Sequence, residues 1–406
     1  MATIRYGANS SIEIGPIDGH EPSEYGRPRV EPLGEVVSEV VAALETPLEY
    51  PALRRGFTPA DRVTIALDHA VPAAADVVAA VVRTAVSAGV DPGYIAVLRG
   101  EGDVAAGLPD PRSALEPPLA EQVELLTHAP GAEKQLAYLA STESGQRVMI
   151  NRALHEADVV IPVGCLQPAD AAGYYGIHTG VFPTYSDTET LERYRAFGSL
   201  TRGGEYRQGL IAEVNEVAWL LGINFTVQVL PGDGFSAGGV LAGQSEAVRR
   251  RARELYTQTW NGARLGSRPA LVIAAISGAG RQTWSDFGRA LDSAGRLVAE
   301  GGAIAVCCEL DEPPGPAMQR MIGAPSRNDA LQEIRAQRPI DALPAAQLAR
   351  ALDDATVYLL SGLDPNLVED LDMVPIEDVD QLRRLAGRHP NYSILNNATC
   401  AIVPVD

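Results

Sequence analysis

The chain has 406 residues, of which 33 are lysine or arginine and 52 are aspartate or glutamate, so its formal net charge is −19. Such a charge repels a phosphate backbone, and we therefore expect no binding to nucleic acid. Hydrophobic residues make up 46% of the sequence, yet no apolar run reaches the roughly 18 residues of a transmembrane helix, so we expect a soluble globular protein with no membrane partner.

Cysteine, lysine and histidine usage restricts the chemistry. None of the four cysteines forms a C-x-x-C pair, so we expect core thiols and a reducing, cytoplasmic location. Lys134 is the only lysine, which leaves one candidate for any covalent link through an amine. The six histidines show no H-x-x-x-H or H-x-H spacing, and so we predict no metal site. Walker and G-x-S-x-G motifs are also missing, which argues against nucleotide triphosphate hydrolysis and α/β-hydrolase chemistry.

Short apolar runs alternate with segments of helical period in the first part of the chain, as expected for parallel strands buried between helices. One helix is predicted to begin near Pro72, and two more to cover 209–221 and 244–260. A hairpin is predicted within 136–150. The predicted strands are 62–67, 94–100, 122–126, 157–163 and 224–230. The first two strands and the helix between them should form a right-handed crossover.

The composition changes near 263–269, a short segment rich in Gly and Pro, and the α/β pattern then restarts. Strands are predicted at 270–276, 302–310, 355–361 and 392–397, and helices at 287–300 and 345–353. We therefore predict an N-terminal α/β domain over 1–262 and a C-terminal α/β domain over 268–406, with a hinge between them.

Three loops follow predicted strands, at 68–72, 164–183 and 277–284, and ligands bind open parallel sheets at this end. If the strand ends of the two domains face each other, the loops would line an interdomain cleft. The polar residues of these loops and of the helix that follows the third are Asp68, His69, Gln167, Asp170, Tyr174, Tyr175, His178, Ser277, Arg281, Gln282 and Asp286.

Each of the strongest candidates in these loops also has a structural interpretation. Asp68 could bind a ligand or cap the helix near Pro72, and His69 could be a general base or a hydrogen-bonded structural residue. The tyrosines Tyr174 and Tyr175 could line a site or pack into the core. Arg281 could clamp a substrate carboxylate or be a solvated loop charge.

The segments TESGQRVMINRALHEADVVIPVG, QPADAAGYYGIHTGVFP and SDTET, within 142–190, resemble the lactate racemase family, as do GGAIAVCCE and LLSGLDPNLV later in the chain. That family uses a nickel-pincer nucleotide to racemise or epimerise 2-hydroxy acids. The positions that match are Thr142, Gly145, Val148, Ile150, Asn151, Pro168, Ala172, Gly173, Gly176, Pro183, Glu189 and Thr190. The resemblance implies two Rossmann-like α/β domains with mainly parallel sheets, an interdomain cleft, and isomerase activity on a small 2-hydroxy acid.

The residues that carry the family's chemistry are replaced. Ala169 stands where the family has an acid/base histidine, Thr179 where a lysine holds the pincer cofactor covalently, and Arg195 where a histidine binds nickel. The segment 98–103 offers no counterpart of the second catalytic histidine. The family implies the nickel-pincer nucleotide as cofactor, but threonine has no amine and arginine is not a nickel ligand.

Two hypotheses follow. In the first, the protein is a lactate racemase-like isomerase with His69, His178 and Asp170 as its acid/base groups. Its substrate carboxylate and hydroxyl would then be bound by Asp68, Tyr174, Tyr175, Arg195, Arg281 and Arg289. In the second, it is an inactive or repurposed relative that binds a small molecule or an active paralogue without the nickel-pincer cofactor. A lyase or hydrolase using the same cleft, and a homo-oligomer, stay open.

Overall fold

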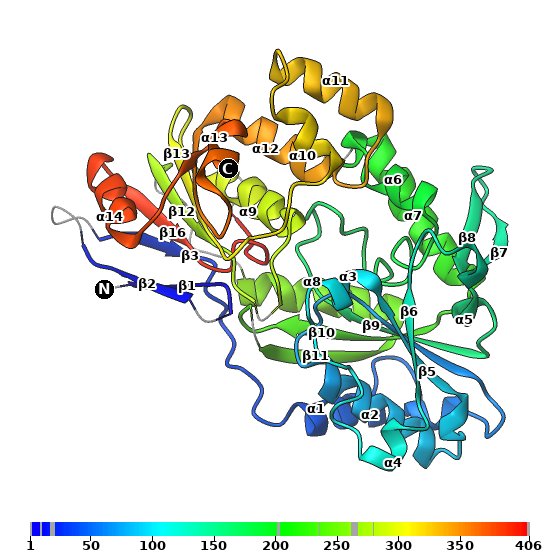
Figure 1. The fold of residues 1–406 in the computed structure, drawn as a ribbon. Coiled ribbons are helices and arrows are strands. Elements are labelled where there is room, and N and C mark those ends of the chain that lie inside the picture. The colour runs from blue at the N-terminus through cyan, green and yellow to red at the C-terminus, as the bar shows by residue number, and fades with distance from the viewer. Residues whose placement is uncertain are drawn as a thin grey trace.

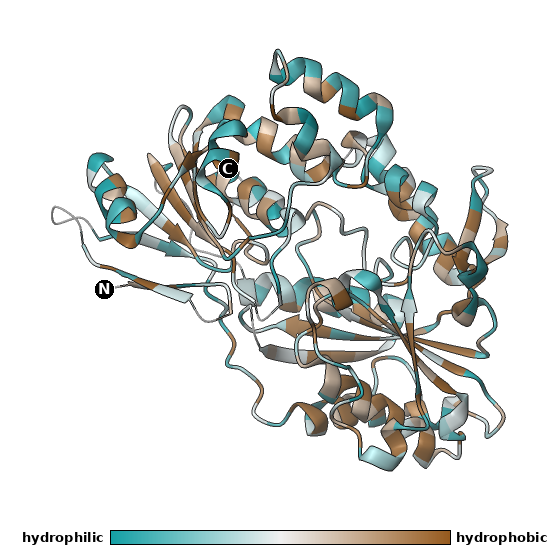
Figure 2. Cartoon of the chain, in the orientation of Figure 1, coloured by the Kyte–Doolittle hydropathy of each residue, from teal (hydrophilic) through white to brown (hydrophobic). Residues whose placement is uncertain are grey.

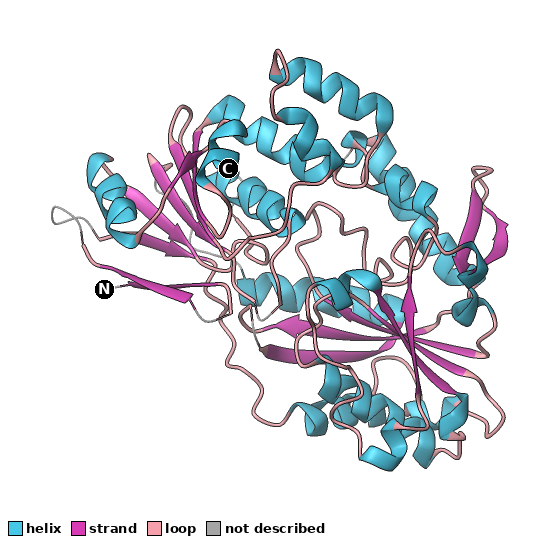
Figure 3. Ribbon diagram, viewed as in Figure 1, coloured by secondary structure: helices cyan, strands magenta, loops and turns pink. Residues whose placement is uncertain are grey.

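Two six-stranded sheets organise the molecule, and helices and loops pack around them (Figures 1 and 3). The computed structural model describes residues 2–8, 10–16, 21–200, 204–234, 236–260, 267–278 and 280–403. We call residues 29–260 the first body, and residues 2–26 together with 267–403 the second body. The strands of both sheets are mostly apolar, while an outer helix such as α11 (Arg327–Gln337) is largely polar (Figure 2). This is the mixed α/β fold that the sequence predicts.

The first sheet has the strand order β11-β10-β9-β4-β5-β6, with all neighbours parallel except β10 and β11. Every residue of the central strand β4 is buried, which explains why its sequence is apolar apart from Thr64. The strand bounds are β4 (Val63–Leu67), β5 (Ile95–Gly100), β6 (Glu124–His128), β9 (Val159–Cys165), β10 (Phe225–Pro231) and β11 (Ala237–Gln244). The predicted hairpin is confirmed as β7 (Leu136–Ser141) and β8 (Arg147–Asn151).

Helices cover both faces of the first sheet. One face packs against α1 (Val36–Glu45) and α2 (Ala74–Ser87), whose small and β-branched residues fill the space above the strands. The opposite face packs against α7 (Glu205–Leu220) and α8 (Ser245–Trp260). The shorter helices are η1 (Leu53–Gly56), η2 (Pro92–Tyr94), α3 (Glu101–Ala105), α4 (Pro117–Ala120), η3 (Glu133–Gln135), α5 (Arg152–His155), α6 (Thr188–Tyr194) and η4 (Phe197–Leu200).

The second sheet has the order β15-β14-β13-β12-β16-β3, and all its neighbours are parallel. Its strands are β3 (Ser23–Tyr25), β12 (Leu271–Ala275), β13 (Ala303–Cys307), β14 (Thr356–Leu360), β15 (Val374–Pro375) and β16 (Tyr392–Leu395). One face carries the hairpin of β1 (Ala2–Tyr6) and β2 (Ser10–Ile14) together with α14 (Val379–Arg388). The remaining helices of this body are α10 (Pro316–Met321), α11 and α13 (Pro365–Asp370).

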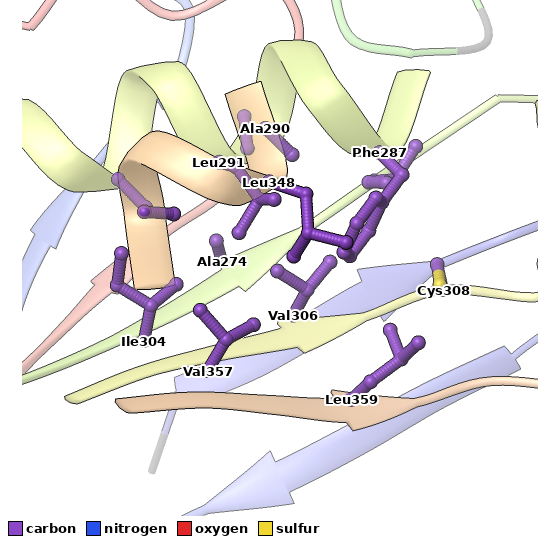
Figure 4. Close-up of a cluster of buried hydrophobic side chains, with 14 of the residues drawn as sticks. Ala274, Phe287, Ala290, Leu291, Ile304, Val306, Cys308, Leu348, Val357 and Leu359 are labelled. Carbon is purple, nitrogen blue, oxygen red and sulfur yellow. The ribbon is translucent and has the colours of Figure 1, made fainter. Parts of the chain in front are cut away.

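The core of the second body lies under α9 (Trp284–Leu297) and α12 (Ala342–Asp354). Phe287 and Leu291 of α9 and Leu348 of α12 face the side chains of β13 and β14 (Figure 4). Leu348 is fully buried, so truncating it to alanine would cost about 2–5 kcal/mol. This packing fixes α9, whose first turn reaches the first body.

The second body is built from both ends of the chain. Strand β3 pairs in parallel with β16, so that Ile394 lies opposite Glu24. The predicted N-terminal domain covers 1–262, whereas in the structure the segment 2–26 packs with the second sheet. A three-residue strand has too short a pattern to show which sheet it joins. The predicted hinge lies largely outside the described residues, which omit 261–266.

Candidate functional site

The two sheets meet at the carboxyl ends of their strands. The guanidinium of Arg289, on α9, donates a hydrogen bond of 3.2 Å to the side chain of Gln167, which follows β9. At the same junction the amide of Arg281 donates to the carbonyl of Ala106, which follows β5 and α3. Loops after β5 and β9 and the first turns of α9 therefore converge, which is where ligands of parallel α/β sheets bind.

His69 and Asp103 form a hydrogen-bonded pair at this junction. His69 follows β4 and Asp103 lies in α3, directly after β5, and His69 Nδ1 is 2.6 Å from Asp103 Oδ1. The imidazole is 43% exposed while the carboxylate is 6% exposed, so the buried acid holds a ring that reaches solvent. Because a carboxylate accepts the hydrogen bond, Nδ1 donates it, and in the neutral form of the ring Nε2 keeps its lone pair.

The charges around His69 decide its protonation. Burial alone lowers the pKa of His69, but the hydrogen bond to Asp103 and the negative charges of Asp103 and Asp286 outweigh it and raise the pKa above its ordinary value. Asp286 comes from the second body, so part of this field is supplied across the junction. A histidine with a raised pKa and a fixed tautomer can act as a general acid or base near neutral pH.

Asp68 lies beside this pair, and its pKa is also raised. Burial raises its pKa to about 6, against the opposing hydrogen bond that its Oδ1 accepts from the amide of His69 at 2.8 Å. A Cβ at Gly180 would lie 2.7 Å from the Asp68 side chain, so only glycine lets the following loop approach so closely. The N-cap of α2 is Ala73, without a side-chain cap, and the interpretation that Asp68 caps this helix is therefore wrong.

Asp286 and Arg289 bring an ion pair from the second body. Asp286 takes part in a capping box with Thr283 at the start of α9, and its Oδ1 accepts a 2.6 Å hydrogen bond from Arg289. Burial raises the pKa of Asp286, but the charges of Arg289 and His69 outweigh it and lower the pKa, so this acid stays ionised. The guanidinium thus lies between the two bodies, where it can meet the carboxylate of a ligand.

Arg207 of α7 holds the loop that follows β9. This arginine is only 4% exposed, and its guanidinium donates to the carbonyls of Ala171 at 3.1 Å and Tyr174 at 2.7 Å. It also donates to the carbonyl of Ser199 at 3.1 Å and lies 5.3 Å from the centre of the Tyr175 ring. A buried cation spread over backbone carbonyls gives the loop a fixed shape.

The residues at the family's lysine and nickel-ligand positions serve the protein's own structure. Thr179 Oγ1 accepts a 2.8 Å hydrogen bond from the amide of Tyr175 and donates one of 2.7 Å to the carbonyl of Gly176. Arg195 is the C-cap of α6, and burial lowers its pKa but leaves it a cation. A hydroxyl bonded within its own turn and a guanidinium do not fit a lysine-linked nickel-pincer nucleotide.

Three other candidates lie in the core of the first body. Tyr175 donates its hydroxyl to the carbonyl of Tyr194 and packs edge-on against that ring at 4.9 Å, and Tyr174 is 8% exposed. Burial raises the pKa of Tyr174, and the nearby Asp68 and Cys165 raise it further. His178 is 7% exposed, and burial lowers its pKa to about 4. A neutral buried imidazole is a poor proton carrier at neutral pH.

Asp170 and Arg281 form ion pairs on the second body's side of the junction. Asp170 accepts a 2.8 Å hydrogen bond from Arg296 of α9, which ties the β9 loop to the second body. Arg281 pairs with Asp311 at 2.7 Å, with its side chain 48% exposed. The structure thus brings Asp68, His69 and Arg289 together and places the other candidates in packing or in ion pairs.

Asp103 and Arg207 were not among the candidates predicted from the sequence. Asp103 lies in the segment 98–103, which has no counterpart of the family's second catalytic histidine. Only the pairing of β4 with β5 brings it to His69. Arg207 lies in a helix, where a charged residue usually faces solvent. Among the described residues no group of three or more His, Cys, Asp or Glu side chains could hold a metal ion, and no helix there is long and apolar enough to cross a membrane.

The fold and the junction define the class: a two-body α/β protein whose facing strand ends carry a histidine–carboxylate pair and an arginine. Residues 6–201 match the model of the lactate racemase N-terminal domain. The structure of the lactate racemase apoprotein from Thermoanaerobacterium thermosaccharolyticum is similar, with a TM-score of 0.75 and 16% identity over 99% of this chain and 100% of that one. Residues 6–201 therefore form a lactate racemase N-terminal domain, in agreement with the sequence motifs within 142–190.

A second solved structure, of a protein from Thermotoga maritima, has a TM-score of 0.67 and 12% identity over 91% of this chain and 98% of that one. A search of curated proteins gave no match. At these identities the structural similarity concerns the fold, and the chemistry has to be argued from the residues of this chain.

Proposed function

We propose that the protein is a lactate racemase-like isomerase that racemises or epimerises a small 2-hydroxy acid at the junction of its two bodies. The observation that carries the proposal is the 2.6 Å bond between His69 and the buried Asp103, next to the Arg289 guanidinium. The fold and the family favour a 2-hydroxy acid, and the cation favours a carboxylate.

In the proposed reaction, His69 Nε2 removes the proton at C2 of the substrate, and the resulting imidazolium returns it to the opposite face after the planar enediolate has turned over in the site. The carboxylate takes up the negative charge that develops, and Arg289 stabilises it. Asp68, with its pKa of about 6, exchanges a proton with the substrate hydroxyl. Because removal and return of a proton involve no net oxidation or reduction, the reaction needs no electron acceptor and therefore not the family's hydride-accepting cofactor.

A second candidate is a relative that binds a small carboxylate and has lost catalysis. It is favoured by Thr179, which stands within the family's motif and bonds to Tyr175 and Gly176 of the loop itself. Under this hypothesis Arg289 binds the carboxylate, and the pair of His69 and Asp103 has no substrate proton to move.

Deuterium exchange separates the two candidates. The protein, produced with and without nickel and the cofactor-assembly enzymes, is incubated in D₂O with lactate and with larger 2-hydroxy acids. Proton NMR then follows loss of the C2 proton, chiral chromatography follows inversion, and calorimetry follows binding. We expect exchange and inversion that do not depend on nickel, and that fall by about 100-fold or more in His69→Gln, because general-base catalysis contributes roughly 10²–10⁴-fold.

The matched control is His155→Gln, since His155 is an exposed histidine on α5. It should leave both readouts unchanged, while Arg289→Gln should weaken binding. Binding without exchange in the wild-type protein would favour the second candidate. Exchange that appears only together with nickel and an added covalent mass would overturn the cofactor-independent mechanism.

A further inference from the structure

A pocket lies between the two bodies, on the side of η4 and α11. It has a volume of about 240 Å³ and takes its lining from η4, α7, α11 and α12. None of its lining residues belongs to the group around His69. A space of this volume has room for several water molecules, and therefore for a small ligand in their place.

The floor and one wall of this pocket are apolar. Phe197 belongs to the first body but packs against the core of the second, and Ile334 and Ala342 are almost completely buried. The phenol of Tyr206 adds a second ring on the side of α7, and its hydroxyl donates to the carbonyl of Arg193 at 2.8 Å. Two rings and an aliphatic floor favour a flat, apolar ligand body.

Two arginines of α11 and its C-cap supply positive charge at the same pocket. The guanidinium carbon of Arg335 lies 5.1 Å from the centre of the Phe197 ring, and Arg338 lines the pocket beside it. Within the described part of the chain neither forms an ion pair, whereas Arg327 on the same helix pairs with Asp353 and Asp372. In a chain with a net charge of −19, two arginines without a carboxylate partner at one pocket favour the binding of an anion there.

We propose that this pocket binds a small organic anion, a carboxylate attached to a flat apolar body. Arg335 and Arg338 would bind the carboxylate, and the body would lie between Phe197 and Tyr206 above Ile334. A guanidinium matches a carboxylate in shape and charge. Because the lining comes from both bodies, the ligand would tie α7 and η4 to α11 and act as an effector that stabilises their contact.

Benzoate is the probe, because it has the charge and the flat ring in nine heavy atoms. Acetate keeps the charge without the ring, and benzyl alcohol keeps the ring without the charge. Saturation-transfer NMR and calorimetry on the full chain should show saturable benzoate binding, with acetate and benzyl alcohol at least about tenfold weaker. The double variant Arg335→Gln/Arg338→Gln should bind benzoate at least about tenfold less tightly, as expected when about 1.4 kcal/mol of binding free energy is lost.

Two controls assign the binding to this pocket. Arg384→Gln/Arg388→Gln removes the same charge from exposed positions of α14 and should bind benzoate as the wild type does. Arg289→Gln removes the cation of the other site and should also leave this binding intact. The proposal is overturned if the wild type shows no saturable benzoate binding, if acetate binds as tightly as benzoate, or if the α11 double variant binds as the wild type does.

Discussion

Replacing Asp68 by asparagine should stabilise the protein even though it removes a group of the proposed site. Burial raises the pKa of Asp68 from 3.8 to about 6, so the folded state holds the proton more tightly than the unfolded chain. Keeping the carboxylate ionised above pH 6 therefore costs folding free energy, and this cost disappears below the unfolded pKa. Asparagine keeps the acceptor for the His69 amide and a similar shape beside Gly180.

The size of the gain follows from the pKa difference. A difference of about two units corresponds to about 3 kcal/mol at pH 8 and to roughly half of that at pH 5. Urea unfolding at both pH values measures it, and Asp370→Asn, an exposed aspartate at the end of α13, should change stability by less than about 0.5 kcal/mol. A variant that is no more stable than the wild type at pH 8, or equally stabilised at pH 5 and pH 8, would refute the reasoning.

Four further predictions follow from the same contacts. Burial lowers the pKa of His178 to about 4, so acidification from pH 8 to pH 5 should lower the free energy of unfolding by about 2 kcal/mol. His178→Gln should not show this loss, and urea unfolding at both pH values measures it. Arg207→Met leaves buried carbonyls unpaired and should cost about 3–5 kcal/mol, with faster hydrogen exchange confined to amides 169–176; unchanged protection there would contradict the role of Arg207. The partly buried ion pair between Asp170 and Arg296 should show a coupling of about 1 kcal/mol in a double-mutant cycle of Asp170→Asn and Arg296→Gln. Asp103→Asn should lower the pKa of His69, followed by NMR titration of the imidazole, and an unmoved titration would mean that Asp103 does not set it.

Most buried strands could be predicted because their sequences are continuous apolar runs. The strands β4, β9, β12 and β13 lie between layers on both faces, and their sequences are apolar except for Thr64 of β4 and the terminal Gly-Cys of β9. Strand β11 was missed because its sequence AGGVLAGQ is rich in glycine, which is depleted in strands. The hairpin of β1 and β2 was missed as well, since two five-residue strands give a weak periodic signal.

The site was only partly predictable, for a different reason. His69 and Arg289 stand at recognisable places, after a strand and on a helix that faces the strand ends. Asp103 could not be chosen in advance, because its role depends on the side-by-side pairing of β4 and β5 and on an orientation that no local pattern records. Thr179 shows the reverse case: the family's motif identified the position, and the structure gives it a bond within its own turn.

The pairing of β3 with β16 has a consequence for how the chain reaches its final form. Ser23 lies opposite Ser393, so β3 can pair only after β16 has been synthesised. The strands of the first body lie between Val63 and Gln244 and can assemble while synthesis continues. Folding should therefore proceed from the middle of the sequence outward, with the amino-terminal hairpin and β3 docking last. Residues 2–25 therefore stay unpaired longest during synthesis, and they are the segment that a chaperone would have to shield for the longest time.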